Sequence, residues 1–114
     1  MSNEQTDYDT RTSETFEVTI NFLSTLPKIL GVKERINIKL KNGSNIIDLF
    51  DKLIEEVSVS FKKIKDALIT DNYKEFGDNI VILLNGKNIS AYEGLETIIN
   101  ENDEITMFIP LGGG

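Results

Sequence analysis

The chain has 114 residues and a mass of 12.8 kDa, which suits one domain built on a single hydrophobic core. It contains no cysteine and no histidine, so the sequence excludes disulfides, thiol nucleophiles, imidazole bases and the usual transition-metal ligands. Because the net charge is −7 and no apolar run reaches membrane-spanning length, we expect a cytoplasmic protein that binds neither nucleic acid nor membranes.

The composition divides the chain into three parts. Residues 1–14 are polar and acidic with no periodic pattern, which predicts a disordered N-terminal tail. Residues 15–111 carry the periodic apolar segments and form the expected domain. Residues 112–114 are all glycine, which predicts a flexible tail at the C-terminal end.

Two neighbouring segments alternate apolar and polar residues, which is the pattern of a strand with one buried face. The first covers residues 16–22, and the second covers residues 36–40 and ends at Asn42 and Gly43. The stretch over 24–33 contains a proline and a glycine and predicts a connection. Together these segments predict a β-hairpin.

The hydrophobic period lengthens after the second strand and predicts two helices. Apolar residues over 46–57 fall on one helical face, and Ser44 or Asn45 can cap the first turn. Residues 57–60 are poor in helix formers, so we expect a break there. A second, short helix is predicted over 61–72.

The last part of the chain predicts a loop, two strands and two turns. The loop covers 73–79, and the apolar run over 80–84 predicts a strand that is covered on both faces or nearly so. Residues 85–88 form an Asn-Gly hairpin turn, and a polar turn over 101–104 leads into a last strand over 105–109. This order predicts an α+β domain in which a mixed sheet wraps one main helix, with the last strand parallel to the first in the middle of the sheet.

The C-terminal residues have an unusual chemical character. Pro110 ends the last strand because it cannot donate a backbone hydrogen bond. Gly112, Gly113 and Gly114 have no Cβ, so this segment can pass through a slot that excludes other residues. The carboxylate of Gly114 would then be delivered on a thin tether into another protein's active site. A frayed end without function is the alternative.

The last strand also predicts a partner-binding surface. Alternation puts Ile105 and Met107 on one face and Phe108 on the other, where we expect it to be exposed beside the tail. With Pro110 and Leu111 it would anchor a protein partner. The alternative is that a neighbouring strand or loop covers Phe108.

Three segments give the chain a resemblance to a known family. Residues 20–31 resemble its opening strand, short helical turn and closing glycine. Residues 81–89 are similar to its strand and Asn-Gly hairpin, and residues 93–114 to its final turn, strand, proline and terminal Gly-Gly. The family is that of the β-grasp, ubiquitin-like sulfur carriers of the MoaD/ThiS type, in particular the molybdopterin synthase small subunit and its archaeal relatives. Asn102 stands where the family often has glycine, and asparagine also tolerates the left-handed conformation.

The resemblance implies a carrier that is not catalytic on its own. An E1-like activating enzyme of the MoeB kind would adenylate the Gly114 carboxylate, and a sulfur donor would convert it to a thiocarboxylate. ATP and Mg²⁺ would be bound by that enzyme, so this chain is expected to hold no cofactor and no metal. Gly113 and Gly114 would be the functional pair, with Gly112 a spacer. The large subunit of molybdopterin synthase (MoaE) would then accept the tail and its sulfur.

Three other functions remain open on the sequence. A ubiquitin-like modifier would transfer the same activated Gly114 to lysines of target proteins. A plain interaction module would have an inert tail. An enzyme would have to use carboxylates such as Asp48, Asp51 and Glu55, which lie within helical reach of one another but more often form a solvated helix face.

Overall fold

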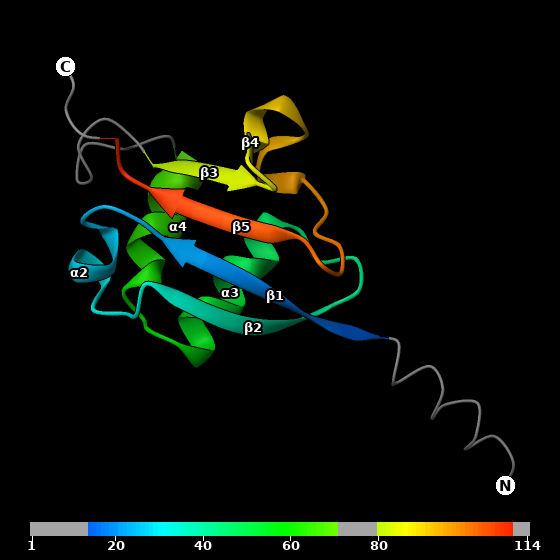
Figure 1. The fold of residues 1–114 in the computed structure, drawn as a ribbon, viewed down its shortest axis with the longest axis horizontal. Helices are drawn as coiled ribbons and strands as arrows, with labels where there is room; N and C mark the ends of the chain where they lie inside the picture. The colour runs from blue at the N-terminus through cyan, green and yellow to red at the C-terminus, as the bar shows by residue number, and fades with distance from the viewer. Residues whose placement is uncertain (1–13, 71–79, 111–114) are drawn as a thin grey trace, which may run out of the picture.

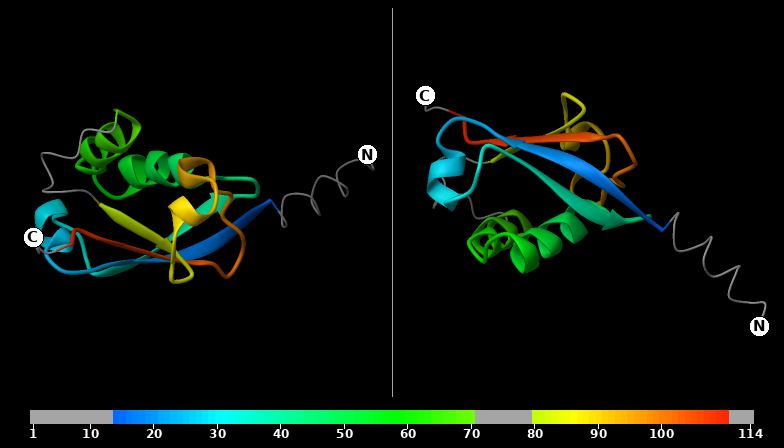
Figure 2. Two further views of the ribbon diagram at one scale, coloured as in Figure 1. Left: turned by 90° about the horizontal axis from the view of Figure 1, so that it is seen from above. Right: turned by 60° about the horizontal axis from the view of Figure 1, so that its bottom comes forward.

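A computed structural model describes residues 14–70 and 80–110 and shows a twisted sheet with helices packed on one face (Figure 1; Figure 2). The predicted tail over 1–14, apart from Glu14, lies outside the described residues, as do the predicted loop over 73–79 and residues 111–114. The elements in chain order are β1 (Thr15–Phe22), α2 (Leu26–Leu30), β2 (Arg35–Lys41), α3 (Ile46–Glu56), α4 (Phe61–Thr70), β3 (Val81–Leu84), β4 (Lys87–Asn88), the 3₁₀ helices η2 (Ile89–Ala91) and η3 (Gly94–Glu96), and β5 (Glu104–Phe108).

The strand order is β2-β1-β5-β3-β4, so the last strand occupies the centre of the sheet. β5 runs parallel to β1, with Phe22 opposite Met107, and antiparallel to β3, with Val81 opposite Phe108. β1 and β2 form an antiparallel hairpin. The predicted α+β, β-grasp arrangement is confirmed, with β5 one residue earlier than its predicted range.

The stretch predicted from its proline and glycine as a connection contains the short helix α2. Pro27 occupies the first turn of this helix, where its fixed φ and missing N–H are tolerated. Gly31 ends it with φ 71°, and its N–H donates to the carbonyl of Pro27 (2.8 Å). The helical turn and closing glycine implied by the family resemblance are therefore present.

The main helix α3 begins at a capping box. The side chain of Asn45 accepts the N–H of Asp48 (2.9 Å), and the Asp48 carboxylate accepts the N–H of Asn45 (3.0 Å). Asn45 is thus the N-cap, one of the two predicted candidates. The chain breaks after Glu56 and resumes as α4 at Phe61; the predicted end of α4 near residue 72 lies outside the described part of the chain.

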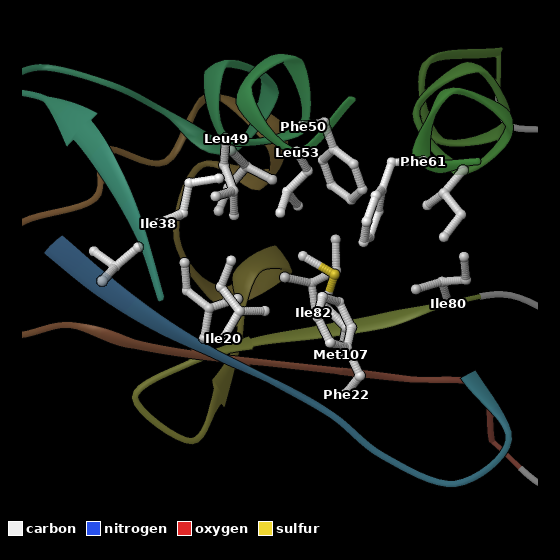
Figure 3. Packing of buried hydrophobic residues seen from close by; sticks show 14 of the residues in the cluster. Ile20, Phe22, Ile38, Leu49, Phe50, Leu53, Phe61, Ile80, Ile82 and Met107 are labelled. Atoms are coloured by element: carbon white, nitrogen blue, oxygen red, sulfur yellow. The ribbon is translucent and has the colours of Figure 1, made fainter. Parts of the chain in front are cut away.

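The core lies between the sheet and the helices α3 and α4 (Figure 3). The ring of Phe61 packs against Phe22 and Phe50, with ring centroids 5.6 and 6.4 Å apart. The largest fully buried side chains are Phe22, Phe50, Phe61, Ile20, Leu26, Leu40, Ile46, Leu49, Leu53, Ile64, Ile82 and Ile99. This cluster connects the strands β1, β2, β3 and β5 to the helices.

The two faces of the strand β3 are covered unequally. Ile82 and Leu84 are buried, but Val81 and Leu83 are only half-buried. The reason is that the described helices lie on one face of the sheet only, and within residues 14–70 and 80–110 no helix covers the opposite face of β3 (Figure 2). The prediction was a strand covered on both faces or nearly so; one face of β3 is buried, and the other face is only partly covered.

Two asparagines take the left-handed conformation that their turns require. Asn85 (φ 53°) and Gly86 (φ 84°) form the two-residue turn between β3 and β4, as the Asn-Gly pair predicted. Asn102 has φ 72° in the turn before β5, so it adopts the left-handed conformation that asparagine tolerates. None of the helices in residues 14–70 and 80–110 is long and apolar enough to cross a membrane.

Candidate functional site

The root of the C-terminal segment is the end of β5. Ile105 and Met107 are fully buried, and Ile109 is only 9% exposed. The N–H of Leu23 donates to the carbonyl of Met107 (2.9 Å), so hydrogen bonds from β1 and β3 hold this end of β5 on both sides. The chain therefore leaves the sheet at Pro110 from a fixed point. The predicted tail residues Leu111, Gly112, Gly113 and Gly114 lie outside the described residues.

Phe108 lies on the outer face of the sheet, away from the helices, as the alternation predicted. It is half-buried rather than freely exposed. The strand register places Val81 directly opposite Phe108, and Leu83 opposite Thr106. Continuing the β1 register beyond Phe22 brings Leu23 level with Phe108, and Leu23 is 47% exposed.

We call Leu23, Val81, Leu83 and Phe108 the outer apolar patch. Pro110 lies two residues after Phe108 and is also half-buried. Of these five residues, the sequence pointed to Phe108 and Pro110 and missed the others. The alternation within β3 could have identified Val81 and Leu83, because successive residues of a strand point to opposite faces and these two alternate with the buried residues.

The other half of the outer face is polar. Asn21 of β1 donates a hydrogen bond to the carboxylate of Glu104 on β5 (2.8 Å), and the guanidinium of Arg35 on β2 lies 3.6 Å from the same oxygen. Thr19 donates to the side-chain carbonyl of Asn37 (2.9 Å) across the β1–β2 pair. The outer face thus has an apolar part beside the end of β5, which is the outer apolar patch, and a polar part that extends from the beginning of β5 over β1 and β2.

Hydrogen bonds fix the beginning of β5 to the β3–β4 turn. The side-chain amide of Asn85 donates to the Asp103 carboxylate (2.8 Å), and its side-chain oxygen accepts the N–H of Glu104 (2.9 Å). The backbone N–H of Asn85 donates to the carbonyl of Glu104 (2.8 Å). The second oxygen of Asp103 accepts the N–H of Asn100 (2.7 Å). We call this arrangement the Asn85 clamp; the sequence indicated Asn85 only as a turn residue.

The carboxylates that an enzyme would need have structural partners. Asp48 belongs to the capping box, and Asp51 pairs with Lys65 (2.5 Å), which joins α3 to α4. Glu55 lies 4.0 Å from Lys52 on the same helix. Each of these three side chains thus has a structural partner, and within residues 14–70 and 80–110 no group of three or more acidic side chains is placed to hold a metal ion.

Lys52 carries a shifted pKa for a local reason. Its ammonium group donates a hydrogen bond to Glu56 one turn further along α3 (2.9 Å), and this bond raises the pKa of Lys52 above its ordinary value of 10.5. The negative charges of Glu56 and Glu55 act in the same direction. A raised pKa keeps the ammonium charged, which suits a helix-surface ion pair and not a general base.

Comparison with known proteins extends this description. The family model described as the ThiS family matches residues 26–114. No curated protein matches the chain. Solved structures also share its fold, and three of them illustrate the similarity. The Haloferax volcanii HVO 2177 protein has 21% identity and a TM-score of 0.63, covering 89% of both chains.

The other two structures cover nearly the whole of their own chains. Small archaeal modifier protein 1 from Methanosarcina acetivorans has 27% identity and a TM-score of 0.52, covering 88% of this chain and 98% of that one. A chain of the complex between subunits 1 and 2 of the molybdopterin-converting factor from Helicobacter pylori has 21% identity and a TM-score of 0.51, covering 87% and 100%. Small proteins of this type are generally carriers without catalytic activity of their own. The chain is therefore a member of the ThiS family of ubiquitin-like sulfur carriers and modifiers, and it has their β-grasp fold.

Proposed function

We propose that this chain is a sulfur carrier whose Gly114 carboxylate is converted to a thiocarboxylate, and that it is the small subunit of a molybdopterin synthase. The observation that carries the proposal is the ThiS family match, which runs through to the terminal glycines. The sequence supports it, because a protein without cysteine needs another way to present a nucleophilic sulfur. The fixed end of β5 supports the proposal too, since a rigid attachment point positions the C-terminal segment more precisely than a mobile one.

The chemistry takes place in an activating enzyme of the E1-like, MoeB kind. A carboxylate oxygen of Gly114 attacks the α-phosphate of ATP, pyrophosphate leaves, and an acyl-adenylate forms. The terminal sulfur of a persulfide donor then attacks the acyl carbon, AMP leaves, and an acyl disulfide to the donor forms. A thiol, as the reductant, attacks the donor's sulfur, forms a disulfide with it, and releases the thiocarboxylate. The activating enzyme binds the ATP and Mg²⁺ for the first step, while this chain supplies the acyl group on a segment without side chains.

The outer apolar patch is the surface that we assign to the large, MoaE-like subunit. It lies beside the end of β5, and its apolar character matches the core of a protein interface. Phe108 provides the aromatic anchor, and Pro110 and Leu111 extend the contact toward the tail. The Helicobacter pylori structure, whose subunits 1 and 2 form a complex, supports a partner of this kind.

A second candidate is protein modification, in which the activated Gly114 forms an isopeptide with a lysine of a target protein. The similarity to small archaeal modifier protein 1, at 27% identity, favours it. Both functions need the same activation step, so the fate of the acyl group separates them.

Intact-mass spectrometry tests both candidates. The protein, tagged at its N-terminus, is recovered from its own cells beside a variant that lacks Gly113 and Gly114. Replacement of one oxygen by sulfur in the full-length protein alone supports the carrier. Gly-Gly remnants on lysines of other proteins support the modifier. An unmodified mass without conjugates contradicts both and leaves an interaction module.

A further inference from the structure

A groove lies between α2 and the beginning of α4, and we call it the α2–α4 groove. It has a volume of about 680 Å³. Two exposed apolar side chains from separate elements face it, Ile29 on α2 (54% exposed) and Val59 before α4 (71% exposed). The complete lining is Ile29, Leu30, Val59, Ser60, Lys62, Lys63 and Asp66.

The walls of the groove are fixed to each other. The hydroxyl of Ser60 donates to the carbonyl of Leu30 at the end of α2 (3.1 Å). Ser58 and Ser60 share a hydrogen bond between their hydroxyls (2.7 Å), and the N–H of Ser60 donates to Ser58 (3.1 Å). Phe61 follows directly and is fully buried in the core. The groove is thus formed before anything binds, which reduces the entropy cost of binding.

The rim of the groove is basic although the whole chain carries a net charge of −7. Lys62 and Lys63 line the groove, and Lys28 precedes Ile29 on α2. Lys62 pairs with Asp66 (3.2 Å), but within residues 14–70 and 80–110 neither Lys28 nor Lys63 forms an ion pair. The local charge therefore opposes that of the chain as a whole.

We propose that the α2–α4 groove binds a short amphipathic segment of a partner protein in which apolar side chains are flanked by carboxylates. The apolar side chains contact Ile29 and Val59, and the carboxylates pair with Lys63. Basic residues beside exposed apolar ones, on an acidic protein, select a segment of opposite charge and disfavour basic segments.

The position of the groove makes this site separate from the outer apolar patch. α2 lies at the end of the sheet where β5 ends, and α4 lies on the helical face (Figure 2). The outer apolar patch lies on the opposite face, because Val81, Leu83 and Phe108 alternate with residues buried under the helices. One partner can therefore occupy the groove while another contacts the patch. The inference does not depend on what chemistry the C-terminal glycines perform.

The test uses the full chain labelled with ¹⁵N and two synthetic helical peptides. One peptide carries leucines on one face and glutamates on the other, and its counterpart carries lysines in place of the glutamates. We expect the acidic peptide to shift the amide signals of Ile29, Val59 and Lys63 and the basic peptide to leave them unchanged. Equal binding of both peptides, no binding, or shifts confined to the outer apolar patch would overturn the proposal.

Matched variants complete the test. Lys63→Glu reverses a charge at the rim, and Lys39→Glu makes the same change on β2, away from the groove. We expect Lys63→Glu to weaken the binding of the acidic peptide by about fivefold and Lys39→Glu to weaken this binding much less. Val59→Asp should weaken the binding of the acidic peptide further. It should not unfold the protein, because Val59 is exposed. Equal effects of the two lysine variants would show that only the net charge of the protein determines peptide binding, which would contradict binding in the groove.

Discussion

The Asn85 clamp yields a prediction whose magnitude follows from its hydrogen bonds. Asn85→Gly keeps a residue that accepts φ 53° but removes two side-chain bonds, one of them to the charged carboxylate of Asp103. Each bond contributes about 0.5–1.5 kcal/mol net, and both lie at the surface, so we expect a loss of about 1–2 kcal/mol. Urea unfolding followed by circular dichroism measures it. The amide of Glu104 should also exchange its hydrogen faster, since it donates to Asn85.

Asn102→Gly is the matched control. Asn102 also has a positive φ (72°), and in the described part of the chain its side chain makes no hydrogen bond. Glycine adds conformational entropy to the unfolded chain and relieves backbone strain at a positive φ. Both effects are therefore similar in the two variants. If Asn85→Gly and Asn102→Gly change the unfolding free energy equally, the clamp contributes nothing and the reasoning is refuted.

Three further predictions concern the core, the interface and a surface charge. Phe61→Ala should cost about 3–5 kcal/mol, because its buried ring joins the sheet to both helices; a loss below 1 kcal/mol in denaturant unfolding would contradict this packing. Leu111→Asp should weaken binding of the large-subunit partner about tenfold in calorimetry while the unfolding midpoint stays unchanged; unchanged affinity would exclude Leu111 from the interface. The pKa of Lys52, followed by NMR, should lie above 10.5 and fall in Glu56→Gln; the stabilisation from this pair is full below the unfolded-state pKa and is lost as pH rises through the higher folded-state value.

Local periodicity was enough to predict most of the elements. Alternation over β1 and β2 and the helical period of α3 are properties of short segments, and each segment buries the face that its pattern indicates. The turn residue Gly31 also followed from local geometry, because few residues accept a positive φ, whereas Asn102 was identified through the family resemblance. The order of the elements also predicted that β5 lies parallel to β1 in the middle of the sheet.

Contacts between distant segments were not predictable in the same way. The half-buried state of Val81 and Leu83 depends on which face of the sheet receives helices, and an apolar run does not contain that information. The second role of Asn85 depends on Glu104, which lies 19 positions away. The α2–α4 groove likewise brings together Ile29 and Val59 from separate elements. These features are set by tertiary packing.

The central position of β5 also determines how the protein bears mechanical load. A force applied to the C-terminal end of this strand acts along its axis, across the hydrogen bonds to β1 on one side and to β3 on the other. The two sets of hydrogen bonds share such a load in shear. They must therefore break at the same time, whereas the bonds of an edge strand can open one after another. A partner that grips the end of the chain can therefore pull the whole domain with it while the sheet stays folded.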